Sequence, residues 1–170
     1  TFKRGGAVFI PSFAVGRAQT LLYYLHLLKA EKAIPDIPVF LNSPMATDAT
    51  HTFCRHLGEH RLTPAQCRQM CGVAKYVNSV EESKELNVHR GPMIVISASG
   101  MATGGRVLHH LKAFAPDPRS TILFAGYQAG GTRGAAMAGG ADSIKIHGEY
   151  VPVRAEVVVL DQMSGHADYT

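Results

Sequence analysis

Short apolar runs alternate with amphipathic segments along this chain, a pattern typical of a parallel β-sheet covered by helices. The runs that predict strands lie at 7–12, 38–42, 73–77, 92–98 and 120–126. Segments with helical spacing or helix-capping residues follow these strands, at 17–33, 43–57, 79–86, 106–114 and 132–138. Ser43 followed by Pro44 is a typical helix start. The fold class expected from this alternation is α/β.

The stretch 143–160 breaks this alternation. It predicts a hairpin that turns at His147–Gly148, followed by a buried strand that ends at Leu160. The polar segment 58–71 predicts an irregular excursion at the surface. His109 and His110 are adjacent in a predicted helix, so they point about 100° apart and cannot jointly hold one metal ion. We expect both to be surface or partly buried residues.

Size and charge narrow the range of functions only a little. A chain of 170 residues suits one domain with a proper core. No apolar run approaches the roughly 18 to 20 residues of a membrane span, which excludes a transmembrane protein. The chain lacks an initiator Met, so we expect a fragment of a longer protein. A net charge of +4 is compatible with a polyanionic partner but is equally common among metabolic enzymes.

The three cysteines lie within a short segment, at Cys54, Cys67 and Cys71. Their odd number predicts reduced thiols of a cytoplasmic protein. Cys67 and Cys71 have helical i, i+4 spacing, and His56 and His60 lie nearby. This leaves a zinc site open, although no partner spacing supports one.

Three polar loops follow predicted strands. The loop PSFAVGR offers Ser12 and Arg17 at a helix start, where an anion binds or where Ser12 caps the helix. The loop SASGMATGGR holds three glycines and three hydroxyl residues, so it brings backbone donors close to a ligand or is a plain long turn. The loop GYQAGGTRG repeats this pattern, with Thr132 as a helix cap. Because the carboxyl ends of parallel strands share one edge, these loops predict a crevice for a phosphate-containing ligand.

Four segments read together resemble the β-CASP branch of the metallo-β-lactamase superfamily, a group of RNA-processing nucleases. They are VFIPSFAVGRAQTLL, ISASGMATGGRVLHHLK, ILFAGYQAGGTRG and VPVRAEVVVLDQMSGHAD. The resemblance implies a three-layer α/β/α domain with a mainly parallel sheet over 1–139. It also implies that 140–170, with its hairpin and strand, re-enters a metallo-β-lactamase domain.

The resemblance also implies a chemistry and a set of partners. His166 in SGHAD matches the residue proposed as general acid. Two zinc ions would serve the full-length protein, whereas no metal ligand and no cofactor are expected within this chain. The implied partners are single-stranded RNA and the protein's own metallo-β-lactamase domain, and a homodimer is left open. The residues implied to bind the RNA backbone are Ser12, Arg17, Ser97, Ser99, Gly100, Arg106, Gly131, Thr132 and Ser164.

The function expected from the resemblance is zinc-dependent RNA hydrolysis, in which this segment caps the active site. One alternative is an inactive RNA-binding or scaffold homologue. Another is an α/β enzyme that binds a small phosphate metabolite. The sequence leaves open whether cleavage is endonucleolytic or exonucleolytic, and whether DNA is accepted.

Overall fold

The computed structural model describes residues 1–89, 91–160 and 162–163. Six parallel strands form one sheet in the order β3-β2-β4-β1-β5-β8, and two antiparallel strands form a separate hairpin. The sheet strands are β1 (Val8–Pro11), β2 (Val39–Leu41), β3 (Lys75–Tyr76), β4 (Ile94–Ser97), β5 (Thr121–Ala125) and β8 (Glu156–Leu160). The hairpin strands are β6 (Ser143–Ile146) and β7 (Glu149–Pro152). The predicted α/β class is therefore confirmed.

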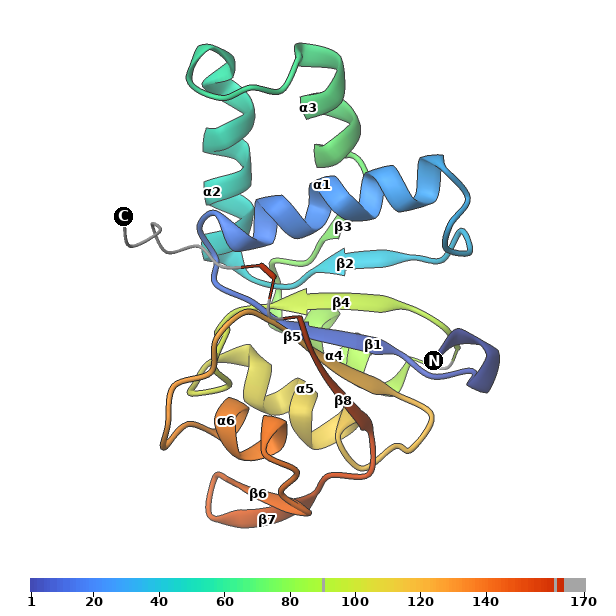
Figure 1. Ribbon diagram of the computed structural model, residues 1–170, viewed down its shortest axis with the longest axis vertical. Helices are drawn as coiled ribbons and strands as arrows, with labels where there is room; N and C mark the ends of the chain where they lie inside the picture. The colour runs from blue at the N-terminus through green and yellow to red at the C-terminus, as the bar shows by residue number, and fades with distance from the viewer. Residues whose placement is uncertain (90, 161, 164–170) are drawn as a thin grey trace.

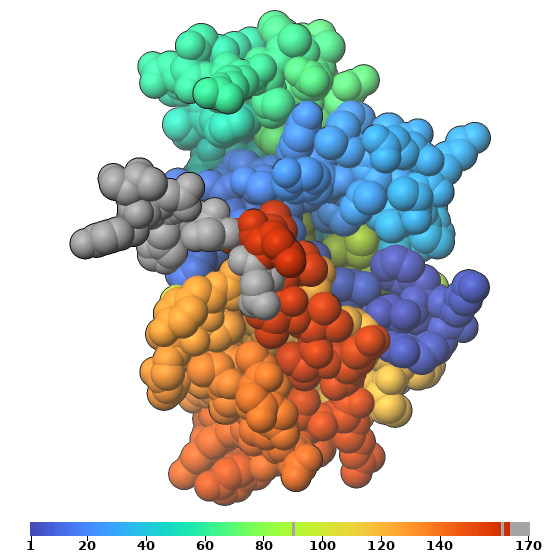
Figure 2. All heavy atoms as spheres, viewed as in Figure 1, coloured from blue at the N-terminus to red at the C-terminus, as the bar shows by residue number. Residues whose placement is uncertain are grey.

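Helices cover both faces of this sheet and complete the three layers (Figure 1). The helices are α1 (Arg17–Ala30), α2 (Pro44–Arg55), α3 (Pro64–Cys71), α4 (Val80–Val88), α5 (Arg106–Phe114) and α6 (Arg133–Ala138). Two short 3-10 turns, η1 (Phe2–Arg4) and η2 (Leu57–Glu59), complete the helical segments. Helices α1, α2 and α3 pack on one face, and α4, α5, α6 and the hairpin pack on the other. In the space-filling view, α2 and α3 form one end of the molecule and the hairpin forms the opposite end (Figure 2).

The sheet is buried on both faces, as its continuous apolar strands require. Adjacent residues of a strand point to opposite sides, so each strand contributes to two core clusters. Phe9 packs in the cluster beneath α5, whereas Ile10 packs in the cluster beneath α1. On β4, Val95 packs in the cluster beneath α5 and Ile96 packs in the cluster beneath α1. The two layers of helices are therefore held by alternate side chains of the same strands.

Side-chain caps define most helix starts, including one that the sequence pattern failed to predict. The predicted cap of α2 is confirmed, because the Ser43 side chain accepts a hydrogen bond from Ala46 N. The expectation of an irregular segment at 58–71 was wrong, since α3 occupies its second half. Thr63 and Gln66 form a reciprocal capping box at the start of α3, and Pro64 takes the first helical position. These residue types are a known helix-start signature, although α3 has few apolar residues to mark it.

The hairpin and the strand after it also follow the predicted pattern, with one difference. The turn falls at His147 (φ 49°) and Gly148 (φ 88°), as predicted. The strand after it, β8, pairs in parallel with β5 along its whole length. It was expected to be buried, but it is mostly half-buried, because it lies at the edge of the described sheet and has a neighbour on one side only. None of the described helices is long and apolar enough to cross a membrane.

Candidate functional site

A crevice of about 560 Å³ opens at the carboxyl edge of the sheet, where β1, β2 and β4 end. The chain leaves β1 and β2 toward helices on one face of the sheet, and it leaves β4 toward α5 on the other face. Neighbouring loops that diverge in this way leave a gap, the usual binding position in open α/β sheets. The residues that line the crevice are 12–14, 42–45, 98, 99 and 104–106.

Three serines predicted to bind RNA lie in or beneath this crevice. Ser12 lines it, is itself largely buried, and donates a hydrogen bond to the carbonyl of Phe13 rather than capping α1. Ser99 also lines the crevice, and its hydroxyl lies 2.8 Å from that of Thr103. Ser97 is fully buried beneath them and donates to the carbonyl of Asn42. Ser12 and Ser99 therefore lie where a ligand would contact them, whereas Ser97 joins β4 to β2.

Gly100 brings the first two loops into close contact. A β-carbon at Gly100 would lie 2.9 Å from Phe13 N, closer than real β-carbons approach, and 3.1 Å from Ser12 C, which is also a tight contact. The third loop is tied to the same point, since Gln128 Nε2 donates to the carbonyl of Gly100 at 3.2 Å. The three loops that the sequence analysis singled out are therefore in contact with one another.

Arg106 lines the crevice, and its guanidinium group donates hydrogen bonds to residues that follow β2 and β3. Its Nη1 donates to Asn42 Oδ1 at 2.8 Å and to the carbonyl of Val77 at 3.1 Å, and its Nη2 donates to the carbonyl of Asn78. These acceptors are neutral, so no carboxylate offsets the guanidinium charge in these contacts. Arg106 thus fixes the shape of the crevice and gives it a positive charge, which favours an anionic ligand.

The buried side chain of His110 forms a hydrogen bond with Asn42. Asn42 Nδ2 donates to Ser83 Oγ at 2.7 Å and to His110 Nε2 at 2.6 Å, and His110 Nδ1 donates to Asn87 Oδ1. Burial first, and then the nearby charges of His109 and Arg106, lower the pKa of His110 to about 4. His110 is therefore neutral at pH 7. This burial corrects the expectation that His110 is a surface or partly buried residue.

The remaining predicted residues lie beside the crevice or outside the described residues. Arg17 begins α1, and its buried Nε has no hydrogen-bond partner among the described residues. Thr132 caps α6, as predicted, by accepting from Ala135 N, and Gly131 precedes it with a φ of 81°. Neither of these two residues lines the crevice. Ser164 and His166 lie outside the described residues, so their roles stay predictions.

Among the lining residues that the sequence did not predict, four have polar or large apolar side chains. Asn42 and Ser43 follow β2, and Phe13 and Met45 expose large apolar side chains there, 49% and 66% exposed. The rule that brought the other loops together applies equally to the end of β2. The signal was overlooked because the SPMAT segment reads first as a helix start.

Two helices begin at the carboxyl edge of β1 and β4 without a side-chain cap. Gly16 precedes α1 with a φ of 77°, and Gly105 precedes α5 with a φ of 75°. By contrast, α2, α3, α4 and α6 all have a serine or threonine cap. Free N–H groups and the positive end of the helix dipole favour an anion at such a position.

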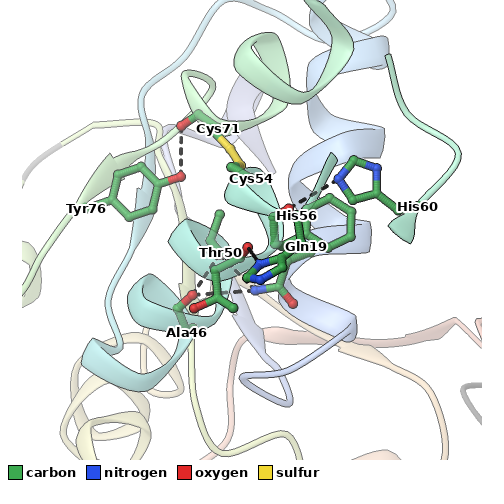
Figure 3. Close-up of a disulfide and its surroundings, with 10 residues drawn as sticks. Gln19, Ala46, Thr50, Cys54, His56, His60, Cys71 and Tyr76 are labelled. Carbon is green, nitrogen blue, oxygen red and sulfur yellow. Dashed lines mark hydrogen bonds between the residues drawn. A yellow bond between two sulfur atoms is a disulfide. The ribbon is translucent and has the colours of Figure 1, made fainter. Parts of the chain in front are cut away.

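The described residues contain no group of histidines and carboxylates that could hold a metal ion. Within 1–89, 91–160 and 162–163, the one group of side chains placed to hold a metal ion is Cys54, Cys67 and Cys71. The structure joins Cys54 and Cys71 in a disulfide (Figure 3), which corrects the expectation of three reduced thiols. The unpredicted helix α3 explains the difference, because it places Cys71 against the end of α2.

Comparisons with known proteins agree with this architecture. The Beta-Casp domain family matches residues 18–137. The chain is 40% identical over 174 residues to "Ribonuclease TTHA0252" of Thermus thermophilus, covering 98% of this chain and 40% of that protein. It is 35% identical over 180 residues to "Transcription termination factor FttA" of Methanosarcina mazei, covering 99% and 28%. It is 33% identical over 173 residues to "RNase J-like protein" of Methanocaldococcus jannaschii, covering 99% and 39%. The chain thus spans 28–40% of the length of these relatives.

Proposed function

The chain belongs to the Beta-Casp domain family, and on that premise we propose that it is the RNA-binding part of a zinc-dependent ribonuclease of the cytoplasm. The crevice between β1, β2 and β4 binds the sugar-phosphate backbone of single-stranded RNA and presents it to the catalytic domain of the full-length protein. The observation that carries this proposal is the position of the crevice at the point where the loops diverge. Relatives named ribonuclease and RNase J-like protein support RNA as the substrate.

The residues that line the crevice are suited to bind the sugar-phosphate backbone of RNA and not to recognise a particular base sequence. Hydroxyl groups of Ser12 and Ser99, the charge of Arg106 and the uncapped start of α5 favour phosphate. Phe13 and Met45 add exposed apolar surface, on which bases of any kind can stack or pack. This combination is typical of proteins that bind single strands with little sequence preference.

Catalysis in the full-length protein requires groups that the described residues lack. In this proposal His166 acts as the general acid, because an imidazole can carry a proton and pass it to the leaving oxygen. The zinc ligands lie in parts of the protein outside this chain. This chain's own contribution is to bind and orient the RNA.

A charge placed inside the crevice tests the proposal. Gly104 lines the crevice, has open space at its β-carbon and has no positive φ, so Gly104→Glu adds a carboxylate without backbone strain. We expect this variant to bind a fluorescent single-stranded RNA at least about tenfold more weakly in anisotropy titrations, since like charges in contact cost several kcal/mol. Gly58→Glu, an equally open position at η2, is the matched control and should bind as the unaltered chain does. Equal binding by both variants would exclude this crevice as the RNA site.

A second candidate function is RNA binding without cleavage, because one relative is named as a transcription termination factor and not as a nuclease. Both functions use the same crevice, so the Gly104→Glu result is expected for either. They differ in whether the full-length protein hydrolyses RNA and loses that activity in His166→Ala. Loss of cleavage with unchanged RNA affinity identifies the ribonuclease, and an absence of cleavage identifies the binding protein.

A further inference from the structure

Helices α2 and α3 form one end of the molecule (Figure 1), and three cysteines that these helices carry lie close together. Cys54 lies in the last turn of α2, and Cys67 and Cys71 lie one turn apart on α3. Their three sulfur atoms all lie within 4.8 Å of one another. Thiolates around a tetrahedral zinc ion are about 3.8 Å apart, since each Zn–S bond is about 2.3 Å long. The cluster therefore has the size of a site for one thiophilic cation.

The backbone spacing leaves room for an ion between the two sulfurs once the disulfide is reduced. The Cα atoms of Cys54 and Cys71 are 7.4 Å apart. Disulfides usually join Cα atoms about 4.4–6.8 Å apart. An ion between two sulfurs spans more, because two Zn–S bonds of about 2.3 Å replace one S–S bond. Cys67 is 1% exposed and stays a free thiol beside this pair, so a third sulfur is already present.

A fourth ligand can approach from an open pocket beside the cluster. A pocket of about 580 Å³ contacts both Cys54 and Cys71, and His51 lines it one helical turn before Cys54. The ring of His51 lies 5.4 Å from that of Tyr76, whose hydroxyl donates to the carbonyl of Cys71. His51 is not in the group whose ligand atoms lie within 4.8 Å of one another, so its exposed side chain must turn toward the three sulfurs to reach a bound ion. Three thiolates and one imidazole are a common ligand set for structural zinc.

The helices that supply these ligands are fixed independently of the cysteines. Gln19 of α1 donates to Thr50 Oγ1 of α2 at 2.8 Å, and Thr50 Oγ1 donates to the carbonyl of Ala46 (Figure 3). The capping box at Thr63 and Gln66 fixes the start of α3. The ligand-bearing turns are therefore positioned before any ion binds. The pocket here shares no residue with the crevice between β1, β2 and β4.

We propose that the reduced chain binds one divalent cation of the zinc class through Cys54, Cys67 and Cys71, with His51 as the fourth ligand, and that this ion clamps α2 to α3. The site is structural, because its four protein ligands leave no position for a substrate. The disulfide uses two of the three sulfurs, so the metal-bound and disulfide forms exclude each other. The site is separate from the zinc centre proposed for the full-length ribonuclease.

Cobalt is the probe that tests this site. The purified 170-residue chain is reduced with a phosphine, freed of metal, and titrated with Co²⁺ without oxygen while its absorption spectrum is recorded. We expect one equivalent to give intense tetrahedral bands with thiolate-to-cobalt charge transfer, and one equivalent of Zn²⁺ to remove them. Cys67→Ser should lose the tetrahedral spectrum although its Cys54–Cys71 pair is intact. His51→Ala should keep the thiolate bands and bind more weakly, whereas His56→Ala on the same helix end should bind as the unaltered chain does.

Mass spectrometry of the unaltered chain keeps the test independent of how the variants fold. Zn²⁺ should protect all three cysteines together from alkylation, and a chelator should remove that protection. Three results each overturn the proposal: octahedral cobalt only, an unchanged spectrum in Cys67→Ser, or a disulfide that persists under the reductant.

Discussion

His110 shows how one buried residue can govern both the crevice and the acid stability of the protein. Its imidazole lies between Asn42 and Asn87 and packs against Phe9 and Phe114. Because Asn42 in turn accepts from Arg106, the position of the guanidinium in the crevice depends on a side chain that no ligand can reach. His110 is therefore a positioning residue for the binding site.

The lowered pKa of His110 predicts a loss of stability in mild acid. Its pKa is about 4 in the folded chain, against about 6.5 when unfolded, so the unfolded state binds the extra proton between these values. The contribution is complete above pH 6.5 and falls as the pH decreases toward 4, by about 2 kcal/mol at pH 5. Urea unfolding from pH 7 to pH 5 measures this slope. We expect His110→Gln, which keeps a donor and an acceptor, to show a smaller slope, and an equal slope would contradict the assignment.

Some of the residues that line the crevice could be predicted from the sequence. Polar residues after parallel strands meet at one edge, which brought Ser12, Ser99 and Arg106 to the crevice. The position of Asn42 at this edge was predictable, but its contacts with Arg106 and His110 were not, because they depend on which strand lies next to β4. Nor could the burial of His110 be predicted, since the adjacent pair His109–His110 carries no signal for which ring faces the sheet.

At the scale of elements, the contact between the first two loops gives a matched pair of substitutions. Gly100→Ala would place its β-carbon within about 3 Å of backbone atoms of Phe13 and Ser12. Gly104→Ala, four residues along the same loop, meets nothing within 4 Å. We expect Gly100→Ala to lower the free energy of unfolding by about 1–3 kcal/mol, as overpacking does, and Gly104→Ala to leave it nearly unchanged. Chemical denaturation of both variants checks this, and similar midpoints would show that the loops separate easily.

Elements with a strong local signal were predicted, and the one without it was not. The strands β1, β4 and β5 are continuous apolar runs, and α2 and α4 begin with serine caps, so their positions were clear. By contrast, α3 buries only Cys67 and Met70, too few apolar positions to give a helical period. Its local evidence was the capping box and Pro64 at the first helical position. Missing it also hid the meeting of the three cysteines.

At the scale of the whole molecule, the class of fold was predictable but the order of its strands was not. Alternation of strands and helices favours a parallel sheet, because each crossover returns the chain to the same edge. The position of β4 between β2 and β1 rests on pairings between residues far apart in sequence, such as Val8 with Ile94. The resemblance from four motifs is confirmed by the family match. The predicted boundary at 139–140 stays a prediction, and β8 on its far side extends the same sheet.

The charge distribution of the whole molecule predicts the salt dependence of RNA binding. A net charge of +4 is spread over the chain, while the carboxyl edge of the central strands holds two guanidinium groups, those of Arg17 and Arg106. Each neutralised phosphate of a single strand contributes about −0.7 to the slope of log K against log salt. Two contacts therefore predict a slope of about −1.4, or roughly sevenfold weaker binding at 200 mM than at 50 mM salt.

Anisotropy titrations of the unaltered chain at four salt concentrations measure this slope. The Gly104→Glu variant, measured in parallel, should not give a steeper slope. A slope near zero would exclude phosphate contacts, and a slope steeper than about −3 would mean that the RNA is held by the general surface charge rather than by the crevice.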